Sequence, residues 1–140
     1  MTLLEEIARL LEELGLGRYQ PSGTNGDIVL GAMPDTPDQV VVLARTAGVE
    51  SDARLGYDEP MVQVRVRGTA GDPVSGEARA QAIYDAVHGL SSRSLPGGTW
   101  LVLSVGTQGG PVFVSRDPDG RDEWVVNLRM ELRRPTTNRS

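Results

Sequence analysis

The sequence predicts a single α+β domain, in which a largely antiparallel or mixed β-sheet carries two helices on one face. The chain has 140 residues, which suits one hydrophobic core but not two. Its apolar periodicity indicates a helix, three strands, a second helix and two or three further strands. Strands grouped between helices are typical of the α+β class. We expect residues 1–134 to form the domain and residues 135–140, PTTNRS, to fray.

The first predicted element is a helix that begins after Thr2. Thr2 and Glu5 have the spacing of a capping box, in which each side chain accepts a hydrogen bond from the other residue's backbone N–H. Gly15 and Gly17 end the helix. Its apolar stripe fits a core position better than a partner interface, because a small domain needs such a stripe. The stripe comprises Leu3, Leu4, Ile7, Leu10, Leu11 and Leu14.

Three strands and a long loop are predicted next. Residues 27–31 and 39–47 are apolar and β-branched, and the proline-rich turn AMPDTPD separates them. Residues 48–60 are polar and have no period, so we expect a long, mobile loop. Residues 61–68, MVQVRVRG, alternate strictly and predict a half-buried strand. One face of that strand carries Met61, Gln63, Arg65 and Arg67, and the other carries Val62, Val64 and Val66.

A second helix and the remaining strands complete the domain. Asp72 is the expected N-cap of this helix, with Pro73 at its first position. Its buried stripe is predicted to be Ala82, Ile83, Ala86, Val87 and Leu90. The segment SSRSLPGG ends the helix. Three more strand candidates follow, in the segments TWLVLSVGT, GPVFVSRD and EWVVNLRMELRR.

Composition excludes several kinds of function. The chain has no Cys and no Lys, which removes disulfides, thiolate nucleophiles and Schiff-base chemistry, and its single histidine is His88. No apolar run reaches the roughly 18 residues of a membrane span, so we expect no membrane partner. The net charge of −5 argues against tight, sequence-specific binding of nucleic acid.

Charge is unevenly divided along the chain. Residues 1–60 hold eleven acidic residues against four arginines, a balance of −7. Residues 61–140 hold eight acidic residues against ten arginines, a balance of +2. This asymmetry allows one face of a subunit to attract the opposite face of a neighbour. Packing of opposite charges within one fold explains it equally well.

The segment RDPDGRD could be a calcium loop or a turn between strands. If Gly120 takes position 6 of an EF-hand loop, Asp117 and Asp119 take positions 3 and 5. Position 12, which requires a bidentate glutamate, is then Val126, and the flanking residues are β-branched instead of helical. A Pro-Asp-Gly turn is a sufficient explanation. We therefore predict a turn and no metal site.

Two other features resemble functional motifs without completing them. The segment GDPVSGEA matches the start of a phosphate-binding P-loop, but Glu77 stands where the lysine should be. His88 falls off the apolar stripe of its helix, with Tyr84 and Asp85 one turn away. A surface histidine is the better interpretation, because no nucleophile lies beside it in the sequence. The sequence therefore predicts no catalytic residue, no cofactor and no metal ligand.

Three segments together resemble the tail-terminator and minor-capsid proteins of long-tailed bacteriophages. They are the strand PMVQVRVRG, the helix EARAQAIYDAVHGL and the C-terminal DPDGRDEWVVNLRMELRRP. The resemblance spans nearly the whole chain and implies a non-enzymatic α+β subunit of the virion, assembled in the host cytoplasm. Such subunits form a homo-oligomeric ring, commonly a hexamer, at the head-proximal end of the tail. The implied partners are the tail tube protein and a head-completion or connector protein.

Four arginines are the candidate interface residues of such a ring. Arg65 and Arg67 lie on the face of their strand that points away from the valines, and Arg129 and Arg133 are spaced by an even number on the last strand. A cyclic oligomer uses two different patches on each subunit, so acidic and basic patches could pair head to tail. The alternative is that these arginines pair with acids of their own subunit.

Two other functions are compatible with the same residues. The chain could be another neck component, such as a head-closure or tail-to-head joining protein. It could instead be a small α+β enzyme or ligand-binding domain that uses His88 and nearby acids.

Overall fold

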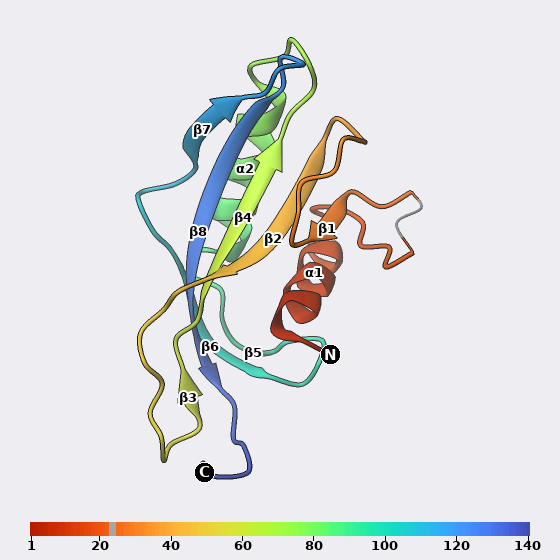
Figure 1. Cartoon of the computed structure of the whole chain (residues 1–140). Coiled ribbons are helices and arrows are strands. Elements are labelled where there is room, and N and C mark those ends of the chain that lie inside the picture. The colour runs from red at the N-terminus through yellow and green to blue at the C-terminus, as the bar shows by residue number, and fades with distance from the viewer. Residues whose placement is uncertain (23–24) are drawn as a thin grey trace.

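The computed structural model describes residues 1–22 and 25–140, and in these residues the chain forms two helices and an eight-stranded mixed sheet (Figure 1). The predicted α+β fold is confirmed. In chain order the elements are α1 (Leu3–Glu13), β1 (Ile28–Leu30), β2 (Val40–Thr46), β3 (Tyr57–Asp58), β4 (Met61–Arg67), α2 (Ser75–Val87), β5 (Ser91–Ser94), β6 (Trp100–Gly106), β7 (Val112–Arg116) and β8 (Asp122–Arg133).

The 12-residue strand β8 is the centre of the sheet. The main strand order is β1-β2-β4-β8-β6-β5, and β3 and β7 also pair with β8. On one side, β8 pairs with β4 and, near its C-terminal end, with β3. On the other side it pairs with β6 and, near its N-terminal end, with β7. All of these pairings are antiparallel, whereas β1 and β2 are parallel.

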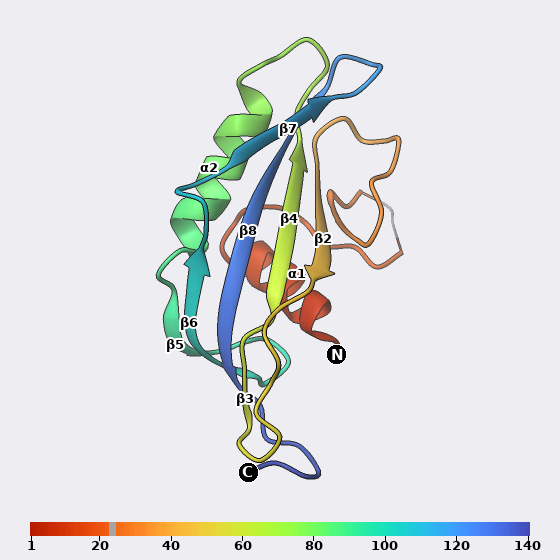
Figure 2. The ribbon, with the colours of Figure 1, turned by 60° about the vertical axis from the view of Figure 1, so that its left-hand side comes forward.

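Both helices cover the same face of the sheet, as Figure 2 shows. Helix α1 packs against β1 and β2, and α2 packs against β4, β6 and β8. Because Val62, Val64 and Val66 alternate with polar residues, one face of β4 is buried against the helices and the other is not. We call the face without helices the open face. On its central strands it carries Gln63, Arg65 and Arg67 of β4 and Val125, Asn127, Arg129, Glu131 and Arg133 of β8.

The two helices begin in different ways. For α1 the predicted capping box is confirmed, because Glu5 N–H donates to Thr2 Oγ1 (3.2 Å) and Thr2 N–H donates to Glu5 Oε1 (2.9 Å). For α2 the predicted start at Pro73 is wrong, because the helix begins at Ser75. Asp72 still accepts hydrogen bonds from the backbone N–H groups of residues 74 and 75. Its carboxylate therefore stabilises the turn that leads into the helix.

The buried stripe of α2 also differs from the prediction. Ala82 is exposed, and the buried residues are Gly76, Ala80, Ile83 and Val87. They recur every three or four residues, as a helix packed on a sheet requires. Glycine and alanine on the buried side of the helix differ little in hydrophobicity from alanine on the exposed side. Periodicity alone therefore placed Ala82 on the buried side, although it is exposed.

Two segments predicted to lack regular structure contain strands, and a third contains a short bridge of its own. Ser91–Ser94, part of the predicted helix stop, pairs with β6 as the edge strand β5. The predicted loop 48–60 contains β3. Residues 135–140, expected to fray, form a bridge between Thr136 and Arg139. For β3 and β5, pairing with a neighbouring strand supplies the stability that the polar local sequence does not. In the described part of the chain, no helix is long and apolar enough to cross a membrane.

Candidate functional site: the open face of the sheet

The open face brings the four candidate arginines onto two adjacent strands. Pairing of β4 with β8 sets Arg65 opposite Val125 and Arg67 opposite Glu123, and Arg129 lies opposite Met61. Residues directly opposite each other project from the same side of a sheet. The alternation predicted for β4 is therefore confirmed, but the surroundings of the four arginines differ strongly.

Arg67 is not available to a partner. It is only 2% exposed, and its guanidinium donates hydrogen bonds to three backbone carbonyls of the β1–β2 connection. Nε donates to Asp38 O (2.9 Å), and one terminal nitrogen donates to Pro37 O (2.7 Å) and Asp35 O (3.2 Å). Arg67 thus fixes the 35–38 loop against β4, and we withdraw it from the candidate interface. The alternating pattern of β4 predicted that Arg67 points away from the valines. It could not predict that the 35–38 loop covers the side chain.

Arg65 and Arg129 are partly accessible and partly paired. Arg65 lies 3.5 Å from Glu123, and its Nε has no hydrogen-bond partner in the described residues. Arg129 contacts Glu59 (3.1 Å) and Glu131 (2.8 Å). Their side chains are 37% and 35% exposed. At such exposure an ion pair stabilises the fold only weakly, so these charges can be shared with a partner at low cost.

Tyr57 completes the polar group around Arg129. Its hydroxyl is 2.9 Å from Glu131 Oε1 and 3.1 Å from Glu59 Oε1. Burial, together with these two carboxylates, raises the pKa of Tyr57 to about 12. Hydrogen bonds from Arg129 and then Tyr57 lower the pKa of Glu131. The tyrosine therefore stays a neutral donor, and Glu131 stays charged.

Arg133 is the most accessible of the four, and two aromatic residues flank it. It is exposed and forms no ion pair with the described residues. Strand pairing places it directly opposite Trp100 of β6 on one side and Tyr57 of β3 on the other. Trp100 is 41% exposed and Tyr57 38%. Tryptophan, tyrosine and arginine are the residues most enriched at the energetic centres of protein interfaces. We call these three residues the Arg133 row.

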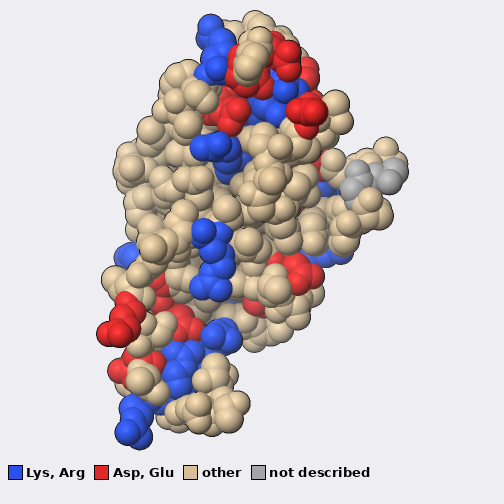
Figure 3. All heavy atoms as spheres, viewed as in Figure 1, with Lys and Arg blue, Asp and Glu red and all other residues tan. Residues whose placement is uncertain are grey.

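Five of the eleven acidic residues of 1–60 pair with arginines of residues 61–140 inside the subunit. Figure 3 shows acidic and basic side chains intermixed at both ends of the molecule. Six ion pairs join an acid of residues 1–60 to an arginine of residues 61–140. They are Asp27–Arg79, Glu13–Arg93, Asp38–Arg121, Glu59–Arg129, Asp58–Arg134 and Asp58–Arg139. The alternative of intramolecular packing therefore accounts for these charges.

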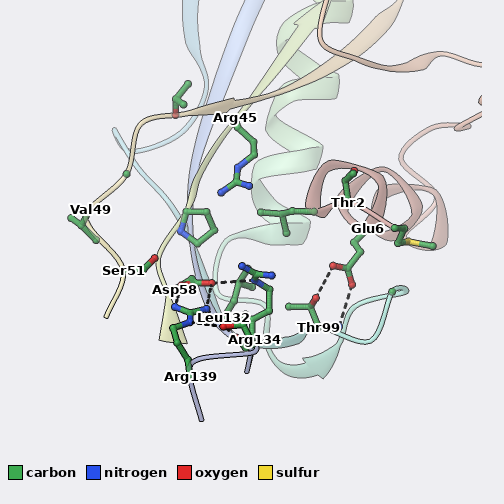
Figure 4. Close-up of a pocket in the computed structure, with 17 residues that line it drawn as sticks. Thr2, Glu6, Arg45, Val49, Ser51, Asp58, Thr99, Leu132, Arg134 and Arg139 are labelled. Atoms are coloured by element: carbon green, nitrogen blue, oxygen red, sulfur yellow. Dashed lines mark hydrogen bonds and ion pairs between the residues drawn. The ribbon is translucent and has the colours of Figure 1, made fainter. Parts of the chain in front are cut away.

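A cavity of about 700 Å³ opens between the start of α1, the 97–99 turn and the C-terminal residues (Figure 4). Asp58 lies 2.6 Å from Arg139 and 3.2 Å from Arg134. The hydrogen bonds from Arg139 hold the pKa of the Asp58 carboxyl well below its usual range. This pairing attaches the C-terminal residues to β3. On the other side of the cavity, buried Glu6 accepts hydrogen bonds from Thr99.

The aspartates of the RDPDGRD segment bind backbone N–H groups and arginine side chains of the same chain. Asp117 accepts hydrogen bonds from the backbone N–H groups of Arg121 and, more weakly, Asp119, and these bonds lower its pKa. The guanidinium of Arg121 then contacts Asp117 (2.8 Å), Asp38 (3.1 Å) and Asp119 (3.2 Å). The predicted turn between strands is confirmed. Among the described residues, no group of three metal-ligating side chains is close enough to hold an ion.

His88 is the C-cap of α2 and is exposed, as predicted. Its Nδ1 accepts a hydrogen bond from Gly106 N–H (2.9 Å), and its ring stacks on Tyr84 at a centroid distance of 4.9 Å. The nitrogen that accepts this bond carries no proton, so only Nε2 can face the solvent as a donor. Asp85 is one turn away in sequence but bonds to Gln81 instead. Asp85 therefore does not orient the histidine for proton transfer.

The sequence model of a family described as bacteriophage tail terminator protein matches residues 10–134. The chain belongs to that family. Comparison with curated proteins finds no match. The family is structural and is not a family of enzymes. This terminator-family protein is accordingly a component of the phage tail.

Sequence reasoning missed two residues of the Arg133 row. Tyr57 lay in the segment 48–60, which was expected to be a mobile loop, and Trp100 opened a strand with no visible link to Arg133. Their pairing is long-range, because β3, β6 and β8 are separated by tens of residues in the sequence. A usable signal did exist, since Tyr57 and Trp100 are two of only six aromatic residues in the chain.

Proposed function

We propose that this protein forms a ring of identical subunits, most simply a hexamer, that caps the tail tube, stops its polymerisation and offers a joining surface to a head-completion protein. The observation that carries the proposal is the family match over residues 10–134, which includes every strand and the whole of α2. A subunit whose function is assembly needs accessible surfaces of distinct chemistry instead of an active site.

The open face supports this proposal chemically. The Arg133 row combines one unpaired cation with two half-exposed aromatic residues, and Arg65 and Arg129 extend the same face. We propose Arg65, Arg129 and Arg133 as contact residues toward another subunit or the tube protein. Because their charges are accessible, association should weaken as salt screens them.

Tube assembly in the presence of the protein tests the proposal. Purified tube protein from the same phage is polymerised with increasing amounts of this protein, and tube lengths are measured by electron microscopy. Tubes should stop growing, and a ring should be visible at one end. The variant Arg133→Glu should require more protein for the same effect. Arg18→Glu is the matched control, because Arg18 is also exposed but lies in the connection between α1 and β1.

Two outcomes contradict the proposal in different ways. Tubes that grow to unlimited length, in the presence of protein that still joins heads to finished tails, would favour another neck component. Tubes that grow unchanged without any bound protein would remove the terminator function altogether. Light scattering over protein concentration and salt measures separately whether the subunit forms a ring on its own.

A further inference from the structure

The strand β7 is the least covered element of the sheet. All five of its residues are exposed, and three consecutive ones are large and apolar: Val112 (37%), Phe113 (49%) and Val114 (40%). Within the described residues β7 pairs with β8 alone, and Figure 1 shows no strand beyond it. Its outer row of backbone N–H and C=O groups is therefore unpaired. A soluble subunit rarely leaves an apolar strand edge open in this way.

The other outer strands carry features that discourage pairing. β5 has the polar sequence SSRS and a positive φ of 53° at Ser92, which bends its edge. β3 has only two residues. β1 has three, and Ile28 at its start already bridges to Tyr19. Short, polar or twisted edges are the usual protections against strand addition. β7 has five residues and is apolar over Val112–Val114, and its first charged residue is Arg116; a register shift between Phe113 and Ser115 is the one irregularity in its pairing with β8.

The apolar side chains of β7 extend surfaces that already belong to the sheet. Val112 lies opposite Val125, which lies opposite Arg65, so the three form one row across the open face. Phe113 lies on the helix side and packs edge-on against Trp124, with ring centroids 5.5 Å apart. A neighbour that covers β7 would therefore also reach Arg65 on the open face.

From these features we infer that β7 is a subunit–subunit contact of the assembled ring, where a segment of a second copy of this chain adds along the free edge and covers Val112, Phe113 and Val114. The inference rests on the proposed ring. A second copy fits better than nucleic acid or an acidic partner, because Val112–Ser115 offer no charge to either. Interfaces between identical subunits are also more apolar than transient ones.

The surface area that a stable interface must bury supports a contact that continues from β7 onto the open face. A stable interface buries about 800 Å² on each partner, which is more than a five-residue strand can supply. The row Val112–Val125–Arg65 continues the surface of β7 onto the open face. The proposed charged contacts and the β7 edge thus belong to one continuous surface.

Charge insertion at the strand edge tests the inference. We expect Val114→Glu to raise the dissociation constant of the ring about ten-fold or more, as loss of an interface contact does. Ala82→Glu is the matched control, because it adds the same charge at an exposed position of α2. The control should assemble like the wild type in sedimentation velocity runs. If the Val114→Glu variant assembles as tightly as the Ala82→Glu control, the inference is overturned.

A labelling experiment covers the case in which Val114→Glu does not fold. The chain has no Cys, so Val114→Cys and Ala82→Cys each introduce a single reactive thiol. Maleimide labelling of Val114→Cys should slow when the ring forms, while labelling of Ala82→Cys should not. Protection of Val114→Cys only after tube or head-completion protein is added would assign β7 to that partner and overturn the inference.

The same measurements separate this inference from the proposed function. A wild-type ring that caps tubes while Val114→Cys stays fully reactive would leave the terminator function intact and remove β7 from the interface. A wild-type protein that neither self-associates nor caps tubes would remove both.

Discussion

Replacing Arg67 by methionine should separate a folding role from an interface role. Arg67 is 2% exposed and donates three hydrogen bonds, of 2.7 to 3.2 Å, to carbonyls of the 35–38 loop. Methionine keeps most of the apolar stem and removes all three donors. The matched control is Arg65→Met, two residues earlier on the same face. There the side chain is 37% exposed and has one ion pair at 3.5 Å.

The expected cost of Arg67→Met follows from these contacts. A hydrogen bond contributes about 1 kcal/mol net, and one to a charged group about 1.5–3 kcal/mol. The 35–38 carbonyls belong to exposed residues, so water can replace part of what is lost. We therefore expect a loss of about 2–4 kcal/mol in the free energy of unfolding. For Arg65→Met we expect less than about 1 kcal/mol, as for a partly exposed ion pair.

Urea denaturation followed by circular dichroism measures both values, and ring formation is measured on the same samples. Arg67→Met should lower the urea midpoint without a change in slope, and the ring should still form under conditions where the variant is folded. Arg65→Met should fold normally but assemble less tightly. An Arg67→Met variant as stable as Arg65→Met would show that the carbonyl contacts do not stabilise the loop. A fully folded Arg67→Met variant that cannot assemble would return Arg67 to the interface.

Three further predictions concern the acidic turn, the histidine and the C-terminal residues. Thermal melts with excess calcium and with chelator should coincide, because the turn carboxylates already bind arginine; a midpoint shift that Asp119→Ala abolishes would contradict this. His88→Ala should leave tail length and infectivity near wild type, and a folded, assembling variant without function would revive an active site. The pKa of Asp58 is lowered in the folded state, so its stabilising contribution is complete above its unfolded pKa of about 3.9 and is lost as the pH falls through the folded value. The protection factors for amide exchange of residues 134–140 should therefore be lost in Asp58→Asn at neutral pH, whereas in the wild type they should fall only as the pH approaches the lowered pKa of Asp58.

Amide exchange also tests the loop 48–60. Residues 48–55 are exposed, and they are held by hydrogen bonds that the Asp52 carboxylate accepts from the N–H groups of residues 54 and 55 and by bonds from Arg139 and Ser140 to carbonyls of the loop. Exchange in 48–55 should be fast in the free subunit and slow in assembled tails, since a partner would have to supply the missing burial. Equal protection in both states would count against a binding role.

The sequence by itself determined the elements that depend on local patterns. The capping box and apolar stripe of α1, the alternation of β4 and the Pro-Asp-Gly turn before β8 all follow from residues close together in the chain. Such patterns act through backbone geometry and need no distant partner. These patterns were sufficient to predict the α+β fold. The order of three such segments along the chain was sufficient to recognise the family.

Only the tertiary structure decided which arginines are accessible and which edge is open. Arg67 and Arg133 look alike in the sequence, as alternating cations on strands, yet a proline-rich loop buries one and two aromatic residues flank the other. β5 pairs despite its polar sequence, and β7 stays exposed despite its apolar one. In each case burial depends on which distant segment packs alongside. The long-range pairing of β8 with β3, β4, β6 and β7 determines which segments pack together. Local sequence periodicity does not predict that pairing.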